Sequence, residues 1–220
     1  MSVSNEADLN LKAPAERRGR LYRGLTSEQR DAARRARLLD AALELFGGQG
    51  FAASTIGAVC ARARVTQRSF YEHFRTREEL LVAVYDQLIE RHAARVAEAL
   101  ADHPDDPAAG LRAGVAAAIR GFLEDERAAR VVMIEIVGAG PTAERRRFEV
   151  IGSYVDLIVD AISTLPGAPP RDESRRVAVA LVGTVNESVI DWLVHEPRER
   201  AAIREIVTTL QRVFAAVVLP

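Results

Sequence analysis

The fold is decided by residues 55–74, which read TIGAVCARARVTQRSFYEHF. Apolar residues recur at three- and four-residue spacing up to Ala63, and this pattern stops at residues 64–66. It starts again with Phe70 and Phe74. The sequence therefore predicts two short helices joined by a three-residue turn, which is a helix-turn-helix arrangement.

The second of these helices has two different faces. Phe70 and Phe74 lie on one side, and the other side carries side chains that form hydrogen bonds. A DNA major groove admits one helix, and its base edges are read by donors and acceptors; Arg68 suits guanine and Gln67 suits adenine. Positions near helix starts and flanks favour phosphate contacts. The candidate DNA-binding residues are Thr55, Thr66, Gln67, Arg68, Ser69, Tyr71, His73 and Arg77.

Helix signals flank the motif on both sides. Thr26 and Gln29 fit a capping box that opens a first helix, which ends in a glycine-rich turn. Ser54 is expected to cap the second helix. Thr76 and Glu79 fit a second capping box that opens a long fourth helix.

Charge is unevenly distributed along the chain. The whole sequence has 30 basic and 31 acidic side chains, but residues 12–77 hold 14 basic and 6 acidic ones. A basic segment attached to an acidic body is expected when one part of a protein meets a polyanion. Residues 1–25 show no helical period and are predicted to form a flexible basic arm. That arm either touches DNA or is a solvated tail.

The motif resembles the TetR family of bacterial transcription regulators over about residues 28–80. The resemblance implies that Thr55, Tyr71, His73 and Arg77 contact phosphates, while Gln67, Arg68 and Ser69 face bases. Two positions depart from the family pattern: Arg64 replaces a usual glycine in the turn, and Arg68 replaces a usual small residue. A left-handed backbone at Arg64 would cost about 1 kcal/mol. The resemblance rests on Thr55-Ile56, Val65-Thr66, Phe70-Tyr71-x-His73-Phe74 and Thr76-Arg77-Glu78-Glu79-Leu80-Leu81.

The rest of the chain is predicted to be helical as well. Apolar residues at helical spacing and helix-capping residues predict five further helices. No alternating strand pattern or internal repeat is present, so the fold class is all-α with about nine helices. The expected further helices cover residues 106–122, 131–137, 141–162, 172–194 and 197–218. The expected domains are the arm (1–25), a helix-turn-helix domain (26–76) and a helical domain for effector binding and dimerisation (77–220).

The family resemblance implies that the C-terminal domain binds a small molecule and dimerises through its last two helices. Polar residues on apolar faces need partners, so they are candidate ligand contacts together with nearby aromatic and Met side chains. The last two helices carry apolar stripes wider than one partner helix would cover. The candidate pocket residues are Phe122, Met133, Glu135, Tyr154, Asn186 and Trp192, together with Glu187 and Asp191. The candidate interface residues are Leu181, Val185, Leu210, Phe214 and Val217.

The sequence carries no recognisable catalytic or metal-binding motif. It has no GxSxG motif and no glycine-rich phosphate loop, and its four histidines lack metal-ligand spacing. We therefore expect no catalytic residue, metal or cofactor. The single cysteine, Cys60, excludes a disulfide framework and is predicted to be buried. No secretory signal or membrane-spanning run is apparent in the sequence, which predicts a cytoplasmic protein.

These observations predict a homodimeric repressor that binds double-stranded DNA at a palindromic operator. A small, largely apolar ligand is expected to release it. Two alternatives remain open: an all-α ligand carrier or enzyme that does not bind DNA, and a DNA-binding regulator without an effector. A steep dependence of duplex binding on salt would exclude the carrier or enzyme.

Overall fold

A computed structural model describes residues 26–103, 105–165, 167–195 and 200–218. The predicted basic arm, residues 1–25, lies outside the described residues. The chain divides into two compact units, Met1–Ala33 and Arg34–Pro220.

The described part of the first unit begins helix α1, which spans Ser27–Gln49. The Thr26 amide donates to the side-chain oxygen of Gln29 at 2.8 Å, and the Gln29 amide donates to the Thr26 hydroxyl oxygen at 3.1 Å. This reciprocal pair satisfies amides that have no partner within the helix. The predicted capping box is confirmed.

The second unit starts with a small helical core. It contains the rest of α1, helix α2 (Ile56–Ala63) and helix α3 (Gln67–Tyr71). Phe46 and Phe70, together with Phe74 just after α3, are almost fully buried and belong to the same hydrophobic core. Two short helices joined by a three-residue turn are therefore confirmed, although α3 ends at Tyr71.

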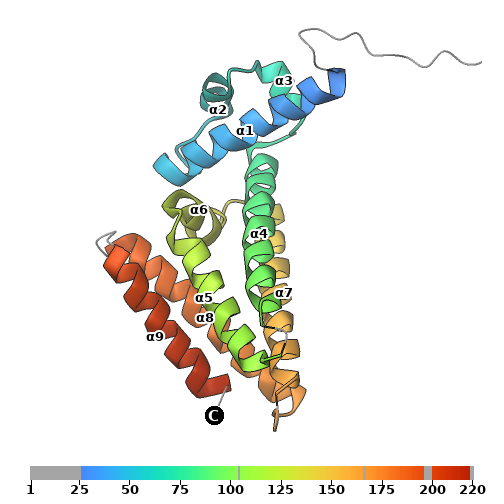
Figure 1. Ribbon diagram of the computed structural model, residues 1–220. Helices are drawn as coiled ribbons and strands as arrows, with labels where there is room; N and C mark the ends of the chain where they lie inside the picture. Colours follow the sequence, from blue (N-terminus) through green and yellow to red (C-terminus); the bar gives the residue numbers. More distant parts are fainter. Residues whose placement is uncertain (1–25, 104, 166, 196–199, 219–220) are drawn as a thin grey trace, which may run out of the picture. The chain divides into compact units, whose positions relative to one another are not determined.

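The helices of the larger part of this unit pack side by side (Figure 1). Helix α4 packs against α5 and α7, α7 packs against α8, and α9 packs against α5 and α8. Asp86 on α4 contacts Arg146 on α7, and His92 contacts Tyr154 further along both helices. Helices α4 and α7 therefore run in the same direction. The bounds are α4 Arg77–Ala101, α5 Pro107–Leu123, α7 Pro141–Ser163, α8 Arg171–His195 and α9 Arg200–Val218.

The segment between α5 and α7 differs from the prediction of one helix over residues 131–137. A short helix α6 (Glu126–Arg130) continues directly into a π-helix, η1 (Val131–Glu135). The side chain of Asp125 caps α6 by accepting a hydrogen bond from the Ala128 amide at 3.1 Å. The predicted helix began at residue 131, five residues too late, because the prediction followed apolar residues and the segment Glu126–Arg130 is mostly polar. The apolar run belongs to η1, and its first three residues are buried.

The described residues form nine α-helices and one π-helix and no strand, which confirms the all-α fold. Among them, α8 alone is long and apolar enough to cross a membrane by length and composition. Core helices that never meet a lipid bilayer pass the same test. Helix α8 packs against α7 and α9, and its Leu181, Val189 and Trp192 side chains are buried in the hydrophobic core.

Candidate DNA-binding surface and ligand cavity

The turn between α2 and α3 is sharp because Arg64 adopts a left-handed backbone. Its φ and ψ angles are 55° and 47°, and it is the one described non-glycine residue with a positive φ. The Val65 amide donates to the Cys60 carbonyl at 3.0 Å, which closes the end of α2. The strained turn that the sequence implied at this position is therefore present.

Helix α3 presents its polar side to solvent. The Arg68 side chain is 92% exposed and lies 3.7 Å from Glu72, and Gln67 is exposed beside it. Tyr71 is 57% exposed, with its ring edge against Phe70. A side chain on this face can reach the base edges or the backbone of a duplex without any rearrangement of the core.

Thr55 and Thr66 hold the starts of α2 and α3. The Thr55 hydroxyl oxygen accepts a hydrogen bond from the Ala58 amide, and the Thr66 hydroxyl oxygen accepts one from the Ser69 amide, both at 3.1 Å. Each hydroxyl keeps its own proton, because only its oxygen is used as the cap. Both residues are exposed, so each hydroxyl proton can be donated to a phosphate oxygen. Thr55, rather than the predicted Ser54, caps α2, since the buried Ser54 hydroxyl donates to the Gly50 carbonyl.

Two predicted DNA contacts, Ser69 and Arg77, are placed differently from the expectation, whereas His73 is half-buried and stays a candidate. Ser69 is buried, because its position on α3 faces the core beside Phe70, so it does not lie on the exposed face. The Arg77 guanidinium donates to the Ser54 carbonyl and lies 4.2 Å from the centre of the Phe51 ring. Arg77 therefore fastens the loop before α2, and its contact with a phosphate stays a prediction.

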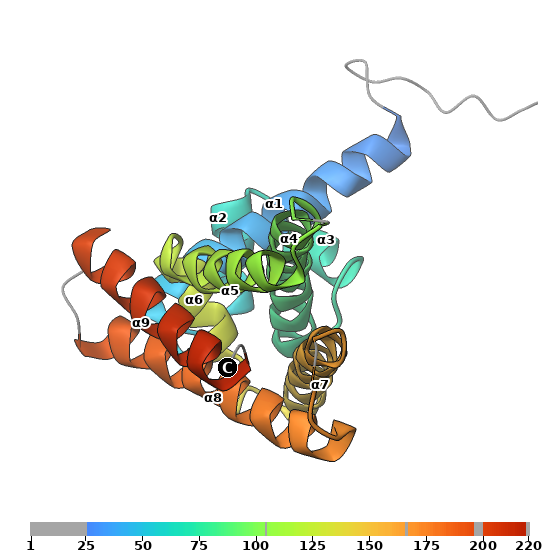
Figure 2. The same cartoon turned by 60° about the horizontal axis from the view of Figure 1, so that its bottom comes forward.

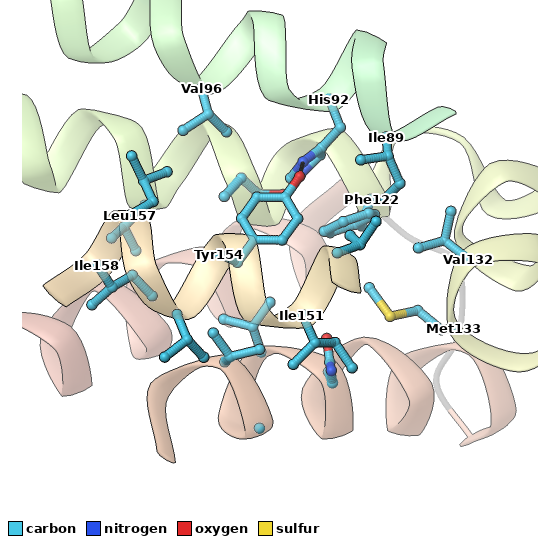
Figure 3. A pocket seen from close by; sticks show the side chains of 18 of the residues that line it. Ile89, His92, Val96, Phe122, Val132, Met133, Ile151, Tyr154, Leu157 and Ile158 are labelled. Carbon is cyan, nitrogen blue, oxygen red and sulfur yellow. Dashed lines mark hydrogen bonds between the residues drawn. The ribbon is translucent and has the colours of Figure 1, made fainter. Parts of the chain in front are cut away.

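A cavity of about 400 Å³ lies within the larger helical part of the second unit (Figure 3). On α4 its lining runs from Tyr85 to Leu100, which corresponds to about 22 Å of helix axis. Val132 and Met133 lie toward one side of Figure 3, and Leu157 lies toward the other. The wall is mostly aliphatic and aromatic, as expected for a site that binds an apolar molecule.

Four of the predicted pocket residues line this cavity: Phe122, Met133, Tyr154 and Asn186, and so does Glu187. Glu135, Asp191 and Trp192 do not line it, so those three placements are corrected. The Glu135 carboxylate instead accepts a hydrogen bond from the Phe51 amide at 2.7 Å. Trp192 lies two residues after the lining residue Ile190, which places it on another side of α8, inside the core.

Comparison with known proteins identifies the family. The sequence profile of the bacterial regulatory proteins, tetR family, matches residues 38–84. An uncharacterized HTH-type transcriptional regulator of Mycobacterium tuberculosis is 30% identical over 170 residues, which cover 73% of this chain and 82% of that protein. The chain belongs to the TetR family. It is therefore a DNA-binding transcription regulator, and its curated relatives are named as regulators rather than enzymes.

One further relative and one solved structure are similar to most of this TetR-family regulator. The HTH-type transcriptional activator FasR of Mycolicibacterium smegmatis is 28% identical over 160 residues, covering 73% of this chain and 72% of that one. The crystal structure of the regulator FadR from Bacillus subtilis, in complex with stearoyl-CoA, matches with a TM-score of 0.65 and 16% identity. That match covers 84% of this chain and 97% of FadR, and it shows a shared fold.

Two carboxylates hold backbone amides where the helix-turn-helix part meets the cavity walls: Glu135 joins η1 to the loop before α2, and Glu78 joins the start of α4 to the start of α7. Glu135 at the end of η1 accepts the Phe51 amide, while its other oxygen lies 3.4 Å from Arg130. One oxygen of Glu78, at the start of α4, accepts the amides of Thr142 and Ala143 at 2.7 and 3.0 Å. Both η1 and α7 supply residues to the cavity lining.

A close backbone contact adds to these joints. A Cβ atom placed on Gly47, near the end of α1, would lie 2.6 Å from the Arg127 carbonyl oxygen and 2.7 Å from the Arg127 Cβ atom. Only glycine permits this distance between α1 and α6. The end of α1 is thus packed directly against the segment that leads into η1.

Most of the predicted interface residues lie inside the fold of this chain. Leu181, Leu210 and Phe214 are buried in the core of the regulator, because α8 and α9 pack on each other and α9 also packs on α5. Val185 is half-buried and lines the cavity. Of the five predicted residues, only Val217 is exposed. Other exposed apolar side chains on these two helices are Val179, Val194 and Val213.

One residue that sequence reasoning missed, His92, occupies the wall of the cavity. It is almost fully buried, and its ring stacks on Phe122 with 3.9 Å between ring centres. The signal was present in the sequence, since His92 takes an apolar position of α4 between Leu88 and Val96. A lone histidine on an apolar face indicates a buried, hydrogen-bonded ring.

Proposed function

We propose that this regulator is a homodimeric, cytoplasmic repressor that a small, largely apolar ligand releases from a near-palindromic operator. The observation that carries the proposal is the shared wall between cavity and DNA-binding part. Val132 and Met133 of η1 line the cavity, and Glu135 of the same five-residue segment holds the Phe51 amide. A ligand that displaces η1 therefore acts on the loop that leads into α2.

Binding to DNA is supported by the exposed side of α3 and by the caps of its neighbours. Arg68 and Gln67 are proposed to read bases, whereas Tyr71, Thr55 and Thr66 are proposed to contact phosphates. The two groups have different roles, because phosphate contacts fix the register of the protein on the duplex and base contacts provide sequence specificity. A dimer would present two such helices to successive major-groove faces roughly 34–36 Å apart or at a helical multiple of that spacing.

Release by a ligand requires that the ligand bind one conformation of the protein better than another. The hydrogen bonds made by Glu135 and Glu78 can transmit such a conformational preference from the cavity to neighbouring segments. A ligand that fits only when η1 or α7 has shifted would strain the bonds from Glu135 or Glu78 to the backbone of the neighbouring segment. A coupling of about 1–3 kcal/mol would change operator affinity about 5- to 150-fold.

Dimerisation is proposed through α8 and α9, which lie side by side in both views (Figure 1 and Figure 2). The exposed apolar side chains Val194, Val213 and Val217 lie on these helices. An isologous contact would cover them on both copies at once.

The nature of the ligand and the direction of regulation have partial support from relatives. FadR of Bacillus subtilis was solved with stearoyl-CoA, and the long aliphatic wall of this cavity suits an elongated apolar molecule. FasR is named an activator, so activation by the same DNA-binding surface is the second candidate function. The alternative is a regulator without an effector, which would be supported if no compound that could enter the cavity changed operator binding.

The proposal is tested on the DNA upstream of the regulator's own gene. Fluorescence anisotropy would measure binding of the full-length protein to fragments selected from that DNA, with and without a panel of apolar compounds that includes stearoyl-CoA. We expect salt-dependent binding of nanomolar strength and at least 5-fold weakening by one or more compounds. Binding that no compound changes would replace this proposal with the effector-independent regulator.

A cavity-filling variant sharpens the same experiment. Ala118 lines the cavity on α5, so Ala118→Trp should keep operator binding and lose the response to the compound. Arg120→Trp is the matched control, because Arg120 is an exposed residue of the same helix that does not line the cavity. A response that survives Ala118→Trp would place the ligand elsewhere.

A further inference from the structure

A hydrogen-bonded pair of side chains is built into the apolar wall of the cavity (Figure 3). The Nδ1 atom of His92 lies 2.6 Å from the Tyr154 hydroxyl oxygen, and its Nε2 atom lies 2.8 Å from the Ala118 carbonyl oxygen. Figure 3 shows the hydroxyl of Tyr154 directed toward the His92 ring. The pair therefore links α4, α5 and α7, and both side chains line the cavity.

The proton positions in this pair follow from its partners. A backbone carbonyl can only accept, so the Nε2 atom of His92 carries a proton and donates it to Ala118. Burial lowers the pKa of His92, which keeps the ring neutral and leaves Nδ1 without a proton. Nδ1 must then accept, and the Tyr154 hydroxyl donates. Burial also raises the pKa of Tyr154 to about 12, so its phenol keeps that proton at neutral pH.

This arrangement fixes what Tyr154 can offer to a ligand. Its single hydroxyl proton is committed to His92, whereas its oxygen retains lone-pair capacity. Tyr154 is only half-buried, and its ring projects from α7 toward His92, with the hydroxyl at the far end (Figure 3). In these surroundings the oxygen is an acceptor without a donor to give. A ligand atom that approaches it gains a hydrogen bond only by bringing a proton.

We propose that the cavity selects an apolar ligand that carries a hydroxyl group, and that this hydroxyl donates to the Tyr154 oxygen. The inference rests on the proposed function, since it names the ligand class of the same cavity. An ether or an ester of the same length places a lone pair against the Tyr154 oxygen and forms no hydrogen bond there. The polar contact would thus distinguish ligands that have almost the same apolar surface.

The test compares two probes of equal length and composition, decanol and its isomer nonyl methyl ether, by isothermal titration calorimetry on the full-length protein. The hydroxyl of decanol can donate, and the ether oxygen cannot. We expect the wild-type protein to bind decanol about 3- to 10-fold more tightly than the ether, as one additional hydrogen bond provides. In Tyr154→Phe, the ratio of the two affinities should fall to one or below while ether binding persists.

A second variant reverses the direction of the hydrogen bond. In His92→Phe, the Tyr154 proton is no longer committed, so Tyr154 can donate to an ether oxygen and ether affinity should rise. A purely structural role of the pair would instead weaken both probes together. Circular dichroism checks the fold of each variant, and Tyr154→Phe carries the test alone if His92→Phe does not fold.

The outcomes separate this inference from the proposed function. Preferential binding of decanol that is lost in Tyr154→Phe supports the inference. Equal binding of both probes by the wild-type protein overturns it and leaves an apolar effector cavity in place. Binding of neither probe overturns the inference as well, and it counts against the proposed effector cavity.

Discussion

Replacing Arg64 by glycine should stabilise the protein, although it removes a charged side chain from the turn between α2 and α3. Arg64 has φ 55° and ψ 47°, a left-handed conformation that costs a non-glycine residue about 1–2 kcal/mol. Glycine adopts it without that cost but gives the unfolded chain more freedom, which offsets about 0.5–1 kcal/mol. The expected net gain for Arg64→Gly therefore lies within about 0–1.5 kcal/mol, with a midpoint of about 0.75 kcal/mol. For a chain of this size that midpoint corresponds to a rise of about 1.5–3 °C in Tm.

The assay is thermal and urea-induced unfolding of the wild-type protein, Arg64→Gly and Arg64→Ala. Alanine removes the same charge and keeps the left-handed strain, so it is the matched control and should give no gain in stability. Loss of one exposed positive charge should weaken DNA binding equally in both variants, because that effect depends on the charge and not on the backbone. A glycine variant no more stable than the alanine variant would refute the assignment of strain to Arg64.

Two further predictions concern DNA reading and assembly. Arg68→Ala should lose about 1–3 kcal/mol of binding free energy on the selected operator and relax the preference at one base pair per half-site, as measured by binding to single-base operator variants. If the variant still discriminates between these operators, Arg68 faces a phosphate or solvent and not a base. Val213 and Val217 are 37% and 49% exposed on α9, and their double replacement by Glu should yield monomer in light scattering. Phe148→Glu is the control, because Phe148 is 64% exposed on α7, outside the proposed interface; an unchanged dimer in the double variant would place the interface on another surface.

Local signals in the sequence were enough to predict most of the fold. The caps at Thr26, Thr66 and Thr76 act through residues three positions away, so they are readable in a short window and are present in the structure. The π-helix η1 was not predicted, because an apolar run shows burial but does not show how the backbone hydrogen bonds are arranged.

The candidate sites were harder to predict, because side-chain partners come from distant parts of the chain. Ser69 looked like a base reader by residue type, but its position on α3 faces the core. Glu135 and Arg77 looked available for a ligand or a phosphate, and the structure shows that each holds backbone groups of the segment from residue 51 to 54. The partners in the Glu135 contact are 84 positions apart in the sequence, and those in the Arg77 contact are 23 positions apart. No periodic pattern indicates contacts at such separations.

The joints made by Glu135 and Glu78 share a property that bears on how the regulator can be re-engineered. Each carboxylate binds main-chain amides, at residue 51 in one case and at residues 142 and 143 in the other. Every amino acid except proline supplies such an amide, so the side chains at these three positions are not part of the bond. These hydrogen-bonded connections therefore depend on the two glutamate side chains and on backbone amides, and not on the other side chains. A DNA-reading module with a different base preference can be grafted onto this sensor body while the transmission between them stays intact, provided that the module keeps glycine at position 47, where α1 meets Arg127 of α6.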